Sequence, residues 1–328
     1  MKQVNATLLL TGVLAGITAA LLVLGANAQP SFASLLYAAS ALPVLIVGLG
    51  WGNIAAIIAV ITAAVIGAVA VSPLFAFAMA IFTLLPAGWL SHLANLARPA
   101  SELGGPQNLM AWYPLSDILL HLCSLVALAV VVLGLMIGYG PDLVSQMVDA
   151  LLQSVQGGEN PALAPDAASV AQLKRMMLTM LPIMQGGTWV LMLFSAYYVA
   201  VRVVAASGHG LRPREDIPSA LRMNRNALFV FLAGILASFY GGVPALVGAT
   251  VCGAFGAGFL LAGFASLHLR TRGKDWRVPA LVLAYLSALL LLPAFFILVL
   301  GLSDTRRTVA LTPARSADKP DEPDNSNT

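Results

Sequence analysis

The chain has 328 residues, of which 59% are hydrophobic and only 9% are charged, and its net charge is +3. A soluble domain carries roughly a quarter charged residues, so this chain cannot cover its surface with side chains that water solvates. The composition excludes a soluble globular protein, favours one that lies in the lipid bilayer, and gives no reason to expect a nucleic-acid partner.

The amino-terminal third is almost free of charge. No Asp, Glu, Lys or Arg occurs between Lys2 and Arg98, and each charge at a bilayer centre costs about 2.5 to 3.5 kcal/mol. Since about 20 apolar residues cross the hydrocarbon as a helix, we predict four spans in this third. They are residues 7–25, 32–50, 53–71 and 74–96.

The sequence LGANAQP ends the first of these spans and resembles the site that signal peptidase cuts. The apolar stretch before it is longer than the core of about 7 to 15 residues found in a secretory leader. A leader also precedes a soluble passenger, whereas more apolar stretches follow here. We therefore interpret this segment as an uncleaved first helix.

A fifth span is expected at residues 115–139, and an amphipathic segment follows it. In PDLVSQMVDALLQSV, residues 141–155, apolar side chains recur on one face and Asp and Gln on the other, which predicts a helix in the membrane interface. A Gly/Pro-rich hinge extends to residue 165, and Asp166 is expected to cap the next helix. That helix can continue to Ala206 and would then be about 60 Å long, so part of it must project or bend.

The remaining spans complete an all-α bundle. They are expected at residues 177–203, 227–240, 245–267 and 278–302. The sequence thus predicts a single transmembrane domain, residues 1–302, with about nine spans, or eight if one segment is re-entrant or miscounted. Residues 303–328 are rich in Asp, Pro, Ser and Asn, and we expect a disordered polar tail.

The positions of the basic residues predict which loops lie in the cytoplasm. The loops of Arg212 and Arg270, together with Arg98 and Lys2, are consistent with one cytoplasmic side, which leaves the acidic residues 142–166 outside. The arginines of the tail do not fit, because nine spans place them outside. A re-entrant ninth segment, or one span fewer, would remove this conflict.

Ionisable residues in membrane segments usually mark functional sites, and here they are scarce. Asp117 and His121 lie one turn apart near the start of the fifth span, and His92 and Asn95 lie near the end of the fourth. These four residues are the candidate site for a small polar ligand or a proton. The alternative is that they cap helix ends and form hydrogen bonds at the interface.

Other motifs indicate packing rather than chemistry. The run VGATVCGAFGAGFLLAG, residues 247–263, has small residues at helical spacing and favours close helix packing over a substrate passage. The sequence shows no catalytic triad, no paired carboxylates and no metal motif. We therefore expect a protein that is not an enzyme and has no cofactor or metal.

The carboxyl-terminal residues resemble those of a known family. Residues 263–268 read Gly-x-x-x-Leu-His, and residues 300–304 read Leu-Gly-Leu-x-Asp before Arg306 and Arg307. With Pro43 in the second span and the Gly-Trp-Gly turn at residues 50–52, this pattern resembles the YybS-like bacterial integral membrane family, which carries the domain of unknown function 2232. The resemblance covers about residues 5–310, although Thr305 directly follows Asp304 where that family often has an aromatic or aliphatic run.

The resemblance implies a function. The YybS-like family is distantly similar to the substrate-binding subunits of energy-coupling-factor transporters, which implies a pocket reached from outside and a separate ATPase as partner. We expect a multi-pass bacterial inner-membrane protein that binds a small molecule in a transporter-like role, with the amphipathic segment as an outer cover. The alternative is a scaffold that recruits envelope or division proteins through basic loop residues. These residues are Arg212, Arg214, Arg222 and Arg225.

Overall fold

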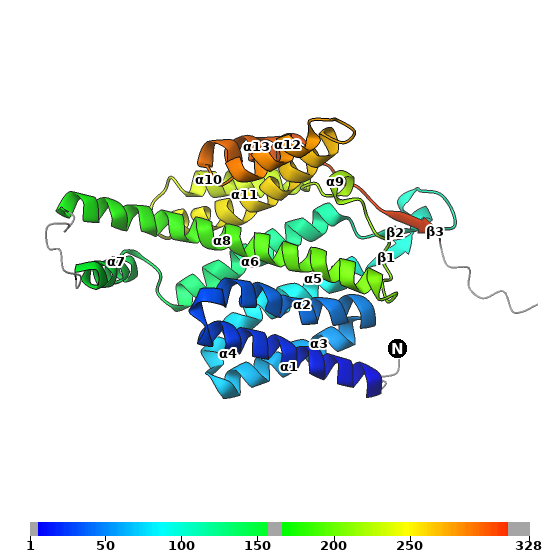
Figure 1. Ribbon diagram of the computed structural model, residues 1–328, viewed down its shortest axis with the longest axis horizontal. Helices are drawn as coiled ribbons and strands as arrows, with labels where there is room; N and C mark the ends of the chain where they lie inside the picture. Colours follow the sequence, from blue (N-terminus) through cyan, green and yellow to red (C-terminus); the bar gives the residue numbers. More distant parts are fainter. Residues whose placement is uncertain (1–5, 157–165, 314–328) are drawn as a thin grey trace, which may run out of the picture.

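The computed structural model describes residues 6–156 and 166–313. Within them the chain is mostly helical (Figure 1), as expected, apart from one small sheet. Seven segments are long and apolar enough to cross a membrane, and each overlaps a predicted span. They are α1 (Ala6–Ala28), α2 (Ala33–Trp51), α3 (Asn53–Ala70), the segment Pro73–Ala94, α6 (Leu115–Met136), α8 (Ala167–Ala206) and α11 (Gly242–Arg270). Pro73–Ala94 consists of α4 (Pro73–Met79), a π-helical turn (Ala80–Leu84) and α5 (Leu85–Ala94).

The prediction of nine spans is not confirmed. The predicted seventh span corresponds to α10 (Arg225–Ala237), whose 13 residues extend only about 20 Å against about 30 Å of hydrocarbon. The predicted ninth span is broken into α12 (Arg277–Ser287) and α13 (Leu291–Ser303), with a bend of 114°. The described residues therefore contain seven candidate spans, or eight if the bent pair is one span.

The last turn of α12 and the residue after α13 both contact the carboxyl-terminal part of α11. On α12, the ring of Tyr285 stacks on Phe264 of α11 with 4.5 Å between ring centroids, and its hydroxyl forms a 2.9 Å hydrogen bond with His268. Directly after α13, Asp304 accepts a 3.1 Å hydrogen bond from Ser266 of α11. A bend of this kind is that of a broken span or of a re-entrant segment, which was the alternative to nine full spans.

We use the term basic end for the end of the bundle formed by residues 94–114, 207–224, 270–276 and 304–313. A three-stranded antiparallel sheet lies there (Figure 1), with β2 (Leu109–Trp112) between β1 (Ala97–Pro99) and β3 (Leu311–Pro313). Arg98 lies in β1, so the basic loops predicted to share one side do meet at one end.

The carboxyl-terminal segment corrects the predicted boundary of the polar tail. Residues 304–313 do not form part of a free tail from residue 303, because they supply partners for polar groups of the bundle. Asp304 pairs with Arg222, Arg307 pairs with Asp117, and β3 pairs with β2. Lys2, the predicted hinge residues 157–165 and the tail residues 314–328 lie outside the described residues.

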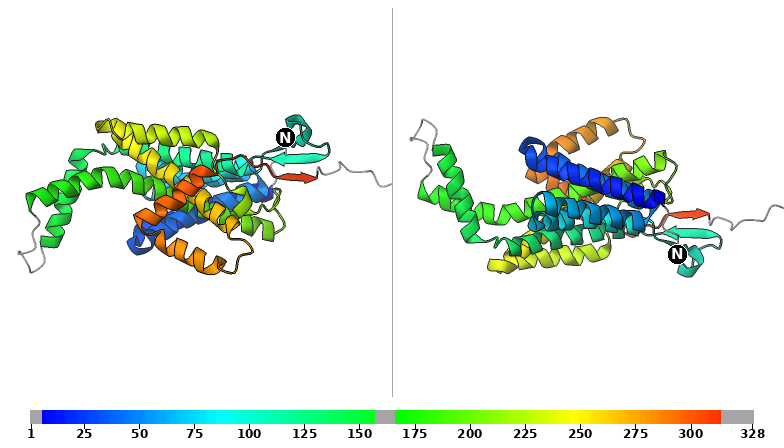
Figure 2. Two further views of the ribbon diagram at one scale, coloured as in Figure 1. Left: turned by 90° about the horizontal axis from the view of Figure 1, so that it is seen from above. Right: turned by 90° about the horizontal axis from the view of Figure 1, so that it is seen from below.

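The opposite end carries α7 (Pro141–Gln156) and the first turns of α8, which extend away from the bundle (Figure 2). The predicted helix is present, but its face against the bundle is not the predicted one: Val144 and Val148 are buried, whereas Met147 and Leu151 of the expected apolar face are exposed. Asp166 caps α8 as expected, since its carboxylate accepts a hydrogen bond from the Ser169 amide at 3.2 Å. These hydrogen bonds with Ser169 lower the pKa of Asp166 below its usual range.

Glycines set the distances between the long helices. Gly253 of α11 lies against the backbone of Ile183 in α8, and a Cβ on Gly186 of α8 would lie 2.9 Å from the carbonyl oxygen of Thr250. Gly263 of α11 and Gly301 of α13 lie against each other's helix backbones in the same way. The packing interpretation of the small-residue run in α11 is thus confirmed.

Candidate functional site

A cavity of about 260 Å³ lies between α6, α7, α8 and α11, at the end of the bundle opposite the sheet. Aliphatic and thioether side chains form most of its wall. The chief ones are Leu133 and Ile137 at the end of α6, Leu143 and Met147 of α7, Leu181 of α8, and Val247 of α11. We call it the α7 cavity, because Leu143 and Met147 of α7 form one side of it.

The wall of the α7 cavity is built around a proline in α8. Pro182 has no amide hydrogen, so the carbonyl oxygen of Leu178, four residues earlier, loses its helical donor. The hydroxyl of Tyr139 donates to the carbonyl oxygens of Leu178 (3.2 Å) and Met177 (3.1 Å) instead. These hydrogen bonds tie the turn between α6 and α7 to α8 at the wall of the cavity.

Further contacts position α7 over the cavity. Lys174 of α8 forms an ion pair with Asp149 of α7 at 2.8 Å. The turn before α7 contains Gly138, whose φ of 67° is a conformation that residues with a side chain rarely adopt. Burial raises the pKa of Tyr139 above its usual range, so this residue remains a neutral donor. Helix α7 is therefore fixed to α8 by the Lys174–Asp149 pair and joined to α6 through the turn at Gly138.

The polar groups of the α7 cavity are few. The hydroxyl of Thr250 donates to the carbonyl oxygen of Leu246 in its own helix at 2.9 Å, and that of Tyr139 is engaged with α8. The exposed amide of Gln185 is the other polar side chain in the wall. Since an unpaired polar group is costly to bury, a ligand that fits here is apolar with one or two polar atoms.

The four site residues predicted from the sequence lie at the basic end, away from the α7 cavity. Asn95 donates from its side-chain amide to the carbonyl oxygens of Gly48 (2.9 Å) and Leu49 (3.3 Å), and so satisfies groups at the carboxyl end of α2. His92 accepts a hydrogen bond from the Asn53 amide at 2.7 Å. Both residues join α5 to the junction between α2 and α3.

The other two predicted residues lie on α6. Asp117 is buried, accepts a hydrogen bond from Asn224 and pairs with Arg307 at 2.6 Å. His121 forms a 3.2 Å hydrogen bond with the Tyr113 hydroxyl. The contacts of all four residues agree with the alternative interpretation of the sequence, in which they cap helix ends and form hydrogen bonds at the interface.

One aromatic ring does bring the two histidines near each other. The Trp89 ring lies 5.6 Å from the His92 ring and 6.0 Å from the His121 ring, measured between centroids. Asn95 instead faces α2, and Asp117 faces the segments before α10 and after α13. The structure thus groups the histidines around Trp89 but does not gather the four side chains on one ligand position.

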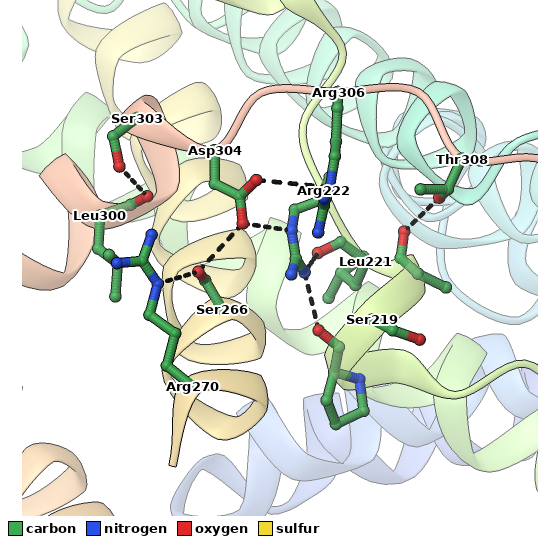
Figure 3. A network of polar contacts seen from close by, with 12 residues as sticks. Ser219, Leu221, Arg222, Ser266, Arg270, Leu300, Ser303, Asp304, Arg306 and Thr308 are labelled. Carbon is green, nitrogen blue, oxygen red and sulfur yellow. Dashed lines mark hydrogen bonds and ion pairs between the residues drawn. The ribbon is translucent and has the colours of Figure 1, made fainter. Parts of the chain in front are cut away.

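A buried arginine organises the basic end (Figure 3). Arg222 has a fully buried side chain, which donates to the carboxylate of Asp304 at 2.7 Å and to the carbonyl oxygens of Pro218 and Leu221. Asp304 lies between Arg222 and Ser266, and Arg306 approaches its other oxygen at 3.4 Å. Burial and the nearby Arg306 lower the pKa of Arg222, and Asp304 opposes this shift.

The loop arginines proposed for a scaffold fall into two groups. Arg222 is buried, and Arg212 donates to Glu215 at 2.6 Å and to the carbonyl oxygen of Ala94 at 3.2 Å, so both hold the fold together. Arg214 and Arg225 are exposed. Of the four arginines, only Arg214 and Arg225 expose their charges at the surface of the protein.

The helices are long enough to cross a bilayer, and they expose many large apolar side chains. These two features define a multi-pass helical membrane protein. A family model described as "Predicted membrane protein (DUF2232)" matches residues 16–305, and the chain belongs to this family. No curated protein and no solved structure matches it significantly.

Sequence reasoning missed the residues of the α7 cavity. Its wall consists mostly of apolar side chains from segments far apart in the sequence, and such residues look alike wherever they lie in a membrane protein. One signal was present, because Pro182 inside a long helix requires a donor for the freed carbonyl group. Tyr139 could not be assigned as that donor before the packing of α6 against α8 was known.

Proposed function

We propose that this protein is a ligand-binding membrane subunit with a transporter-like role, which holds an apolar small molecule in the α7 cavity. The observation that supports the proposal is the cavity itself, which is closed on one side by an amphipathic helix. A volume of about 260 Å³ is slightly smaller than the 300 to 1,000 Å³ typical of drug-sized ligand sites, so it suits a small ligand or one end of a chain.

The position of the cavity agrees with capture from the side opposite the basic loops. If those loops face the cytoplasm, as the positive-inside rule predicts, the α7 cavity lies toward the outer surface of a bacterial inner membrane. Binding would then need no catalytic group, and we propose that the protein is not an enzyme. A separate ATPase or envelope protein would act at the basic end, in the manner of energy-coupling-factor transporters.

The proposal predicts that the purified protein retains a small molecule that Gly134→Phe displaces. Gly134 lines the α7 cavity, and a Cβ there meets only Tyr139 at an ordinary 3.7 Å, so a larger side chain can extend into the cavity. Native mass spectrometry of the protein released from detergent should show the bound mass in the wild type. In Gly134→Phe the affinity should fall at least about tenfold, as for the loss of about 1.4 kcal/mol of binding energy, and the bound fraction should fall with it.

Two kinds of control separate this result from a general disturbance. Gly25→Phe introduces the same side chain in α1, where a Cβ meets only Leu36 at 3.7 Å, and should leave the bound fraction unchanged. Asp117→Asn and His121→Ala should also retain the molecule, because both residues lie at the basic end. A wild-type protein that carries no small molecule, or equal loss in both phenylalanine variants, would contradict the proposal.

A further inference from the structure

A second cavity, of about 380 Å³, lies at the basic end and is separate from the α7 cavity. Its wall consists of the last turns of α8, the start of α6 at Leu115, and residues 212–218 before and within α9 (Ile217–Ala220). We call it the arginine cavity, because Arg202, Arg212 and Arg214 all contribute to it.

Internal bonds fix the rim of the arginine cavity. Arg212 and Glu215 form an ion pair with side chains only 7% and 12% exposed, and Arg212 also bonds to the carbonyl oxygen of Ala94 at the end of α5. On α8, the guanidinium of Arg202 lies 5.6 Å from the centre of the Tyr198 ring, at cation–π distance. The cavity is therefore held in shape without any bound molecule.

The charges around the cavity do not balance. Its two acidic residues have arginine partners of their own, since Glu215 pairs with Arg212 and both oxygens of Asp216 accept from Arg272 at 2.7 and 2.9 Å. The bond with Arg272 lowers the pKa of Asp216, so this carboxylate stays ionised and occupied. Arg202 and Arg214 form no ion pair with any acidic residue that the structure describes, and both are exposed.

The remaining wall is apolar and aromatic. Phe194 and Val201 of α8 and Ile217 of α9 face the cavity beside Tyr197, whose side chain is almost completely buried. Tyr198, at the same level of α8, is 39% exposed and so reaches the outer face of the bundle. A ligand with an anionic group and an adjoining apolar part is complementary to both features, and basic pockets between membrane helices bind phospholipid head groups elsewhere.

From this geometry we propose that the arginine cavity binds a phosphoryl group, which Arg202 and Arg214 neutralise while the apolar wall receives the adjoining part of the ligand. The proposal is independent of the α7 cavity, because the two lie at opposite ends of the bundle. The phosphoryl group could belong to an anionic phospholipid or to a soluble phosphate compound, and the two sources share the chemistry that the arginines recognise.

The test compares lipids on the delipidated full-length protein by native mass spectrometry. Phosphatidylglycerol should bind about 30-fold more tightly than phosphatidylcholine, whose choline group cancels the phosphate charge. In the variant Arg202→Gln/Arg214→Gln the affinity for phosphatidylglycerol should fall about 30-fold and the preference should disappear, since each arginine near an anionic head group contributes about 1 kcal/mol. Inorganic phosphate, titrated in a separate series, tests the soluble source.

The matched control is Arg225→Gln/Lys274→Gln, which removes two exposed charges from the same end without touching the cavity. This control should bind phosphatidylglycerol like the wild type, and both double variants should unfold at the wild-type temperature. Binding of inorganic phosphate that depends on Arg202 and Arg214, without a lipid preference, would support the site and assign it to a soluble ligand. Equal losses in the two double variants, or no anion preference at all, would overturn the proposal.

Discussion

Gly253→Ala should separate α8 from α11 and destabilise the whole bundle. The new Cβ would overlap the backbone atoms of Ile183, because it would lie much closer to them than van der Waals contact allows. A backbone cannot move aside as a flexible side chain can. Forcing extra volume into a packed core typically costs about 1 to 3 kcal/mol, and the rigidity of the facing backbone places this change at the upper end or beyond it. Thermal unfolding in detergent, followed by circular dichroism and by the monodisperse fraction after heating, measures the loss.

Gly256→Ala is the matched control on the same helix. A Cβ at position 256 meets side-chain atoms of Leu298 and Phe231 at 3.7 Å, which is an ordinary van der Waals contact. Alanine also has a higher helix propensity than glycine. This variant should therefore unfold at or above the wild-type temperature, and an equal loss in the two variants would show that the α8–α11 crossing does not require glycine.

Asp304→Ala should cost about 3 to 5 kcal/mol of stability, because it leaves the fully buried charge of Arg222 without a counter-charge. Ser266 and Arg306 would lose the same partner. The effect should appear as a lower unfolding temperature and as faster proteolysis after residue 304, because the carboxylate also fixes that segment to the bundle. Asp304→Asn keeps an acceptor oxygen and should be affected less.

Two comparisons distinguish this buried pair from an ordinary surface contact. Asp216→Ala removes a partner of Arg272, but both side chains of that pair are about half exposed, so the cost should be at most about 1 kcal/mol. In Arg222→Met/Asp304→Leu neither charge remains, and a hydrophobic pair at a buried site is often no less stable than the ion pair. The double variant should thus be more stable than Asp304→Ala, and the reverse order would contradict the assigned role.

Hydropathy predicted most of the long helices because the hydrocarbon excludes charges, and this rule acts on each segment by itself. It failed where the path of the chain depends on neighbouring segments. The residues of α12 and α13 are apolar enough for one span, and hydropathy does not show that they are bent by 114° and pack on α11. Likewise the apolar segment predicted at residues 227–240 corresponds to α10, which ends at Ala237 and is too short to be one of the candidate spans.

The polar residues illustrate a second limit. Asp117 was recognisable as unusual, but whether an isolated carboxylate binds a ligand or an internal arginine depends on Arg307, which is 190 positions away along the sequence. The polar composition of residues 304–313 predicted disorder. It did not show that Asp304 and Arg307 pair with buried groups of the bundle. The need of Arg222 for Asp304 could not be inferred, because the sequence does not show that Arg222 is buried.

The separation of Arg222 from Asp304 by 82 positions imposes an order on biogenesis. While the ribosome feeds helices into the translocon, the arginine emerges first and must wait in a hydrated place until the aspartate has been synthesised. The pairing of β2 with β3, and the side-chain hydrogen bond across 200 positions from Trp112 to Thr312, also have to follow. A nascent chain stalled between these points thus carries the charge of Arg222 without its counter-charge.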